Sequence, residues 1–113
     1  WRTLKNAGGR VVFASDWPVA PIDPILGIKC AVQRKPWAAS DPDQSFSLME
    51  AIAGYTVEGA YAEFAENRKG RLKTGFLGDL VVLSEDIERA KAERLQEVRP
   101  VTTVCGGRVT YQA

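Results

Sequence analysis

Histidine is absent from this sequence, and its absence restricts the chemistry that the chain can perform by itself. Histidine is the commonest metal ligand in proteins and the commonest general acid or base near neutral pH. Cysteine is scarce too, because the 113 residues include only Cys30 and Cys105, which lie far apart. This spacing predicts neither a disulfide framework nor a Cys-x-x-Cys metal site, and we expect two buried thiols.

Long apolar runs and blocks of like charge are also missing. No apolar run approaches the roughly 18 residues that a membrane helix needs, and no secretory signal pattern is visible. The 15 basic and 14 acidic residues give a formal net charge of +1, and neither sign is clustered. We therefore expect a cytoplasmic protein with no nucleic-acid partner and no membrane partner.

The residues that are present predict one modest globular core. Hydrophobic residues make up 45% of the chain, and charged residues make up 26%. The length allows no more than one ordinary domain. The sequence opens on Trp1, in what reads as the middle of a helix, and we expect it to be a piece of something longer.

The stretch Phe13–Val19 is the first place to look for chemistry. Residues 10–14 include the apolar run Val11, Val12 and Phe13, which predicts a strand covered on both faces and ending near Asp16. Catalytic groups collect at strand ends in parallel α/β folds. Asp16 is thus a candidate catalytic acid, although an acid in this position can also do no more than cap a turn.

Helices and loops alternate through the middle of the chain. Gly8-Gly9 predicts the end of an N-terminal helix, and the prolines between residues 17 and 23 predict an ordered loop. Asp23-Pro24 predicts a helix to about residue 34, followed by a polar surface loop over residues 35–44. The capping box Ser47-Leu48-Met49-Glu50 predicts the next helix. Thr56 is expected to cap a further helix with an apolar stripe through residues 57–64.

The last third has a different pattern. Leu80–Leu83 is a predicted strand, and residues 87–96 are predicted to form a short surface helix. Residues 100–105 and 108–111 read as two strands joined by the turn Gly106-Gly107, because paired glycines suit tight hairpin turns. The tail thus predicts about three strands of an antiparallel sheet.

Several motifs together resemble the amidohydrolase superfamily, in the branch that includes N-substituted formamide deformylases. The motifs are Ala14-Ser15-Asp16-Trp17-Pro18-Val19, Pro21-Ile22-Asp23-Pro24, Ser47-Leu48-Met49-Glu50-Ala51, Tyr55-Thr56, Gly59-Ala60-Tyr61-Ala62, Lys69-Gly70, Gly75, Asp79-Leu80-Val81-Val82-Leu83 and Val104-Cys105-Gly106-Gly107-Arg108-Val109-Thr110-Tyr111. They cover nearly the whole chain in the family's order. Thr74 and Gly78 depart from the family pattern, which often has proline and alanine there.

The resemblance implies an α/β fold and a division of the chain. Residues 1–66 would supply the last strand and closing helices of a metal-dependent-hydrolase (β/α)8 barrel. Residues 67–113 would supply the C-terminal part of a composite β-sandwich. A complete barrel needs about 250 residues, so the chain would be the C-terminal portion of an enzyme.

The same resemblance assigns site residues. It implies that Asp16 contacts a divalent metal, commonly zinc, and acts as general acid and base, while the family's histidine ligands lie outside this sequence. Trp17 and Val19 are candidates for lining the substrate pocket, although Trp17 could equally be fixed in the core. Ser15 could orient Asp16 or serve the local backbone. Asp23, Asp41, Asp43 and Asp79 are expected to be structural or solvated.

Two hypotheses about function result. In the first, the intact protein hydrolyses carbon–nitrogen bonds other than peptide bonds, in a small-molecule amide or formamide, with Asp16 carrying the proton. In the second, the 113 residues alone are a non-catalytic structural or self-association fragment, inactive when isolated. We expect no metal on this fragment alone, because one carboxylate without histidines cannot make a three-ligand zinc site. Uncovered apolar faces favour a homo-oligomer or a swapped assembly.

Overall fold

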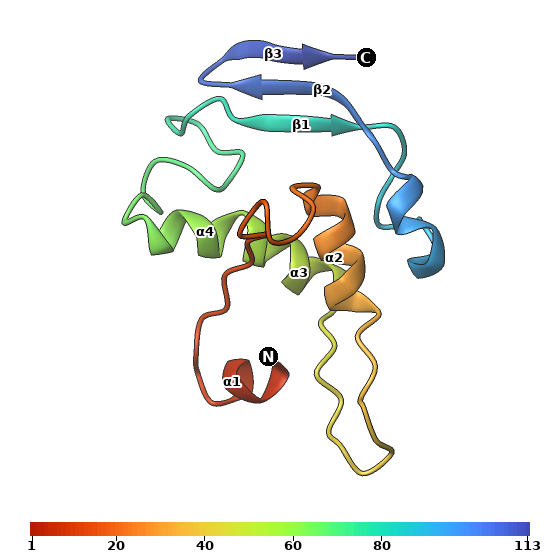
Figure 1. Cartoon of the computed structure of the whole chain (residues 1–113). Coiled ribbons are helices and arrows are strands. Elements are labelled where there is room, and N and C mark those ends of the chain that lie inside the picture. The colour runs from red at the N-terminus through yellow and green to blue at the C-terminus, as the bar shows by residue number, and fades with distance from the viewer.

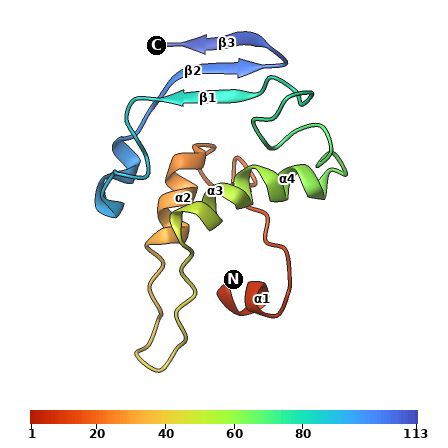
Figure 2. The same ribbon diagram turned by 180° about the vertical axis from the view of Figure 1, so that it is seen from behind.

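Four short helices lie within residues 2–62, and three strands occupy the last third of the chain (Figure 1). The computed structural model describes all residues, 1–113. The helices are α1 (Arg2–Asn6), α2 (Pro24–Val32), α3 (Leu48–Tyr55) and α4 (Val57–Ala62); the strands are β1 (Leu80–Leu83), β2 (Pro100–Cys105) and β3 (Arg108–Gln112), with a 3-10 helix, η1, at Ala92–Glu97. The fold is a small α/β arrangement. Figures 1 and 2 show the sheet at one end, and α1 and the loop after α2 at the other.

The sheet is antiparallel throughout, in the order β1-β2-β3. Gly106 and Gly107 connect β2 to β3 with φ angles of 57° and 76°, which glycine adopts without steric cost. The Asp79 carboxylate accepts a hydrogen bond from the Gly106 amide at 2.7 Å, which ties the start of β1 to this turn. The predicted strands, their hairpin and the structural role of Asp79 are confirmed.

Helices α2 and α3 begin at the predicted caps. The Asp23 carboxylate accepts from the Ile25 amide at 2.9 Å, with Pro24 in the first helical position. At α3, the Ser47 hydroxyl accepts from the Glu50 amide and the Glu50 carboxylate accepts from the Ser47 amide, which completes the capping box. Each cap satisfies amides that the first turn of a helix leaves without partners.

The hydrophobic core lies where α2, α3 and the segment after η1 meet. Its central cluster consists of Ile25, Ile28, Ala31, Phe46, Ala51 and Val98. Ile25, Ile28 and Ala31 recur at helical spacing on one face of α2, and Ala51 allows α3 to approach that face closely.

The predicted strand at residues 10–14 is not formed, and this segment pairs with no strand. Val11 and Phe13 pack against the core cluster, whereas Val12 is 42% exposed. The expectation of a strand covered on both faces is therefore wrong for this chain. The physical reason is that all three strands lie beyond residue 79 and pair with one another, so nothing in the chain covers the second face.

Both cysteines are exposed, which corrects the expectation of buried thiols. Cys30 lies on the side of α2 away from the core residues, and Cys105 is the last residue of β2, beside the hairpin turn. The predicted helix over residues 87–96 is instead the 3-10 helix η1, which begins and ends later and buries Leu95.

Two expectations about α4 are also wrong. The Thr56 side chain does not cap this helix, because its hydroxyl donates to the Ile52 carbonyl at 2.8 Å, within the preceding helix. Phe64 lies beyond the end of α4 with a φ of 56° and is 90% exposed. It therefore does not continue the apolar stripe, of which Ala60 is the buried member.

The chain exposes an unusually large surface for its size. Its accessible surface is 8117 Å², whereas about 6,100 Å² is typical of a folded monomer of this mass. The radius of gyration is 15.1 Å, compared with about 13 Å for a compact domain of this length. The exposed side chains include large apolar residues of the strands, such as Val81, Val109 and Tyr111. None of the helices has the length and apolar content required to span a membrane.

Candidate active-site segment

The segment that carries Asp16 is anchored to α3 through Phe13. The Phe13 amide donates to the Gly54 carbonyl at 3.1 Å. The Phe13 ring lies edge-on to Trp1 and Phe46, at centroid distances of 5.3 and 5.4 Å, and 5.6 Å from Tyr55. These contacts place the end of the apolar run against the helices and direct the chain on to Asp16.

Asp16 lies in a tight turn with an uncommon backbone conformation. Its φ is 51°, a left-handed value that aspartate tolerates better than most non-glycine residues. The Asp16 carbonyl accepts from the Val19 amide at 2.9 Å, and the Ser15 hydroxyl accepts from the Trp17 amide at 3.2 Å. Ser15 thus serves the local backbone, and Asp16 is exposed.

The two candidate pocket residues follow Asp16 on the exposed turn. Trp17 is 66% exposed and Val19 is 80% exposed. The alternative in which Trp17 is fixed in the core of this chain is therefore wrong. Ile22, which is 71% exposed, extends the same apolar surface. Large apolar side chains gathered beside one carboxylate are typical of ligand-binding surfaces.

For the implied metal site the chain offers one candidate oxygen ligand, Asp16, and no complete ligand set. The Asp16 carboxylate is accessible, and a carboxylate oxygen is a suitable ligand for zinc and for other divalent cations. No group of three or more histidine, cysteine, aspartate or glutamate side chains is arranged to hold a metal ion. The donor chemistry of Asp16 therefore fits a shared site, whose remaining ligands would come from residues outside these 113.

The other candidate acids have local structural partners. Asp23 caps α2, and Asp41 accepts from the Ala38 amide at 3.0 Å in the loop after α2. The backbone amide and then the hydroxyl of Ser45 donate to Asp43, which lowers the pKa of this carboxyl below its usual value. These bonds agree with the expectation that the three acids are not catalytic.

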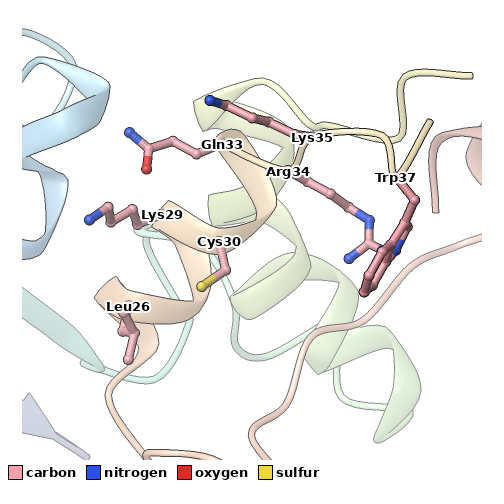
Figure 3. A pocket seen from close by; sticks show the side chains of 7 residues that line it. All are labelled: Leu26, Lys29, Cys30, Gln33, Arg34, Lys35 and Trp37. Atoms are coloured by element: carbon pink, nitrogen blue, oxygen red, sulfur yellow. The ribbon is translucent and has the colours of Figure 1, made fainter. Parts of the chain in front are cut away.

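A second feature, which the sequence did not predict, is an open hollow of about 420 Å³ beside the C-terminal half of α2. Its lining residues are Leu26, Lys29, Cys30, Gln33, Arg34, Lys35 and Trp37. Figure 3 shows that these side chains spread apart: Lys29 and Gln33 point to one side of the helix, and Arg34 and Trp37 lie on the other. The Arg34 guanidinium lies over the Trp1 ring, 4.5 Å from its centroid. The hollow does not include Asp16.

Comparison with known proteins identifies the family to which the chain belongs. The chain is a member of the amidohydrolase family, which it matches over residues 1–111. The resemblance inferred from its motifs is thereby confirmed.

Individual relatives match the chain as follows. It is 31% identical to a putative amidohydrolase, YtcJ, of Bacillus subtilis, over 99% of this chain and 22% of that protein. It is 37% identical to the protein LONG AFTER FAR-RED 3 of Arabidopsis thaliana, over 74% of this chain and 15% of that protein. It is 29% identical to an N-substituted formamide deformylase of Arthrobacter pascens, over 98% and 21%. The chain thus spans 15% to 22% of the length of these three curated relatives, and no solved structure matches it.

Proposed function

We propose that this chain is the C-terminal part of a metal-dependent amidohydrolase that hydrolyses carbon–nitrogen bonds other than peptide bonds in a small amide or formamide. Membership of the amidohydrolase family supports the reaction class, and the likeness to an N-substituted formamide deformylase supports the substrate class. Residues 1–66 would complete a (β/α)8 barrel, and residues 67–113 would contribute strands to a β-sandwich.

The observation that carries the proposal is the position of Asp16. Its carboxylate is accessible in the turn that follows the apolar run Val11–Phe13, next to the exposed apolar side chains of Trp17 and Val19. In the proposed site Asp16 would contribute one oxygen ligand to a divalent metal, with zinc as the expected ion. When bound, such an ion lowers the pKa of water toward neutrality.

Asp16 would move the proton in both halves of the reaction. Its carboxylate would accept a proton from the water that attacks the substrate carbonyl. The same carboxyl group would then donate that proton to the departing nitrogen, so that the carbon–nitrogen bond breaks and an amine leaves. Trp17 and Val19 would orient the substrate and exclude bulk water. The isolated chain would form a homo-oligomer or a swapped assembly, because its exposed apolar faces favour association.

The test is Asp16→Asn in the full-length protein, assayed with a panel of N-substituted formamides and simple amides. Loss of a positioned general acid and base lowers turnover by about 10²- to 10⁴-fold. Asp41→Asn is the matched control, because Asp41 is an exposed acid whose amide replacement can still accept from the Ala38 amide. Wild-type turnover by Asp16→Asn, or no hydrolysis of any panel member by the wild type, would contradict the proposal.

The second candidate is a non-catalytic role for the 113 residues when they occur alone. The incomplete ligand set favours it for the isolated chain. Hydrolysis of any panel member by the isolated chain would exclude it.

A further inference from the structure

Gly54 on α3 leaves room for Phe13, the residue that anchors the segment leading to Asp16. A Cβ atom at position 54 would lie 2.5 Å from Cδ2 and 2.9 Å from Cε2 of the Phe13 ring. Distances below 3.0 Å between such atoms are essentially never seen, so a side chain of any size at position 54 requires Phe13 or α3 to move. The absence of a side chain at Gly54 therefore determines how closely the segment around Phe13 approaches α3.

The backbone of residues 10–15 is bonded to the rest of the chain at one point only. The bond from the Phe13 amide to the Gly54 carbonyl is the only backbone–backbone hydrogen bond that these residues make. Asp16 follows three residues later, and the residues between them belong to no helix or strand. Phe13 is therefore the last backbone anchor before the Asp16 turn, and the position of that turn depends on where Phe13 is held.

The Phe13 ring has little freedom to move aside. Trp1, Phe46 and Tyr55 surround it at centroid distances of 5.3, 5.4 and 5.6 Å. Protein interiors are close-packed, so a methyl group inserted at such a contact displaces backbone as well as side chains. The ring would transmit the displacement to the segment that carries it.

We propose that Gly54 is a positioning residue for Asp16: its bare backbone fixes the contact with Phe13, and this contact fixes the point from which the Asp16 turn projects. This inference rests on the proposed function of Asp16. It assigns Gly54 no contact with the substrate. A catalytic group displaced by about 1 Å can lose about 100-fold in rate, so a methyl group at a distance is sufficient to impair turnover.

The chain offers a matched control for the substitution. Gly54 and Gly59 both lie in helices, in α3 and α4 respectively. A Cβ at Gly59 would meet no atom within 4 Å, in contrast to the close contact at Gly54. Gly54→Ala and Gly59→Ala therefore add the same methyl group to a helix, with and without the collision.

The experiment measures kcat, KM and metal affinity of these variants in the full-length protein. Gly54→Ala is expected to lower kcat by about 30-fold with KM changed less than about threefold, and to weaken metal binding in competition with a chelator by about tenfold. Gly59→Ala is expected to match the wild type in all three. Phe13→Leu in the Gly54→Ala background should restore kcat to within about threefold of Phe13→Leu alone, because the smaller side chain relieves the collision.

The outcomes distinguish this inference from the proposed function. Wild-type turnover by Asp16→Asn would contradict both the catalytic role of Asp16 and the positioning role of Gly54. If Asp16→Asn is inactive while Gly54→Ala is fully active and binds metal normally, only the role of Gly54 is contradicted. If Gly54→Ala does not fold, the double variant is the test: folding and turnover like those of Phe13→Leu support the inference. A double variant that is unfolded, or inactive while Phe13→Leu is active, overturns it, because the added methyl group then acts elsewhere than on Phe13.

Discussion

Arg2 and Glu50 form a bidentate ion pair that joins the N-terminal helix to α3. Nη1 of Arg2 donates to Oε1 of Glu50 at 2.8 Å, and Nη2 donates to Oε2 at 2.7 Å. The same guanidinium donates to the Ser45 carbonyl from Nε and Nη2. Because Glu50 also closes the capping box with Ser47, one carboxylate connects α1, the loop before α3 and the first turn of α3.

This carboxylate predicts how stability depends on pH. The hydrogen bond from Arg2, followed by that from the Ser47 amide, lowers the pKa of Glu50 from 4.5 to about 2. Because the folded-state pKa lies below the unfolded value, the contribution of Glu50 is complete above pH 4.5 and is lost as the pH falls toward 2. Thermal melts between pH 6 and about 2 should show this loss, and Glu50→Gln should reduce it while keeping a capping side chain. An equal loss in both proteins would contradict the assignment.

Gly27 of α2 and Tyr55 of α3 form a second close contact between helices, and this contact predicts the effect of a substitution at Gly27. A Cβ at position 27 of α2 would lie 1.9 Å from the Tyr55 hydroxyl oxygen and 2.8 Å from Cζ. Gly27→Ala should therefore lower the free energy of unfolding by about 1 to 3 kcal/mol, although alanine is the better helix former. Chemical denaturation measures this loss. Tyr55→Phe in the same background should recover part of it, and Gly59→Ala should cost nothing. A Gly27→Ala variant as stable as the wild type would show that the Tyr55 side chain or the helices move aside without cost.

The hydrogen bond between Asp79 and Gly106 is expected to hold the β2–β3 turn in one conformation. Its carboxylate accepts from the Gly106 amide at 2.7 Å across 27 positions of the sequence. Asp79→Ala removes the acceptor and should cost about 1 kcal/mol, a typical net value for one hydrogen bond. The sharper measurement is hydrogen exchange, in which the Gly106 amide should lose protection while the Phe13 amide keeps it. Unchanged exchange at Gly106 would mean that the turn holds its shape without Asp79.

The sequence predicts features whose causes lie within a few residues of each other. The capping box of Ser47 and Glu50, the helix start at Asp23-Pro24 and the Gly106-Gly107 turn are local, and the structure has all three. The unpaired segment at residues 10–14 could not be predicted in the same way, because an apolar run fixes extended backbone but not the presence of a neighbouring strand.

For the candidate site too, local sequence patterns were predictive, whereas contacts between distant residues were not. The motif around Asp16 and the motifs that follow it along the chain together indicated the family, which the comparison confirms over residues 1–111. The left-handed conformation of Asp16 and the contact of Phe13 with Gly54 were not predicted. Phe13 and Gly54 are separated by about forty positions, and no local pattern in a single sequence indicates that one ring lies on one glycine.

Metal content should differ between the isolated chain and the full-length protein. A catalytic zinc site needs three protein ligands, and the chain offers Asp16 without two partners. Elemental analysis of the isolated chain after desalting should therefore show no stoichiometric metal, whereas the full-length protein should retain it. Asp16→Asn in the full-length protein should weaken retention. One tightly bound ion per isolated chain would indicate that another ligand set, or a second copy, completes a site.

The exposed sheet predicts self-association of the isolated chain. Strands β1 and β3 are both edge strands, and Val81, Val109 and Tyr111 are 51%, 61% and 51% exposed. Edge strands that carry exposed apolar side chains pair readily with other chains, and lysine in such positions prevents it. Light scattering should therefore find an oligomer for the isolated chain, and Val109→Lys should shift it toward the monomer. Arg108→Lys is the matched control, because it leaves the charge at the neighbouring position unchanged. A monomeric wild-type chain would contradict the prediction. An oligomer unaffected by Val109→Lys would show that the interface does not involve β3.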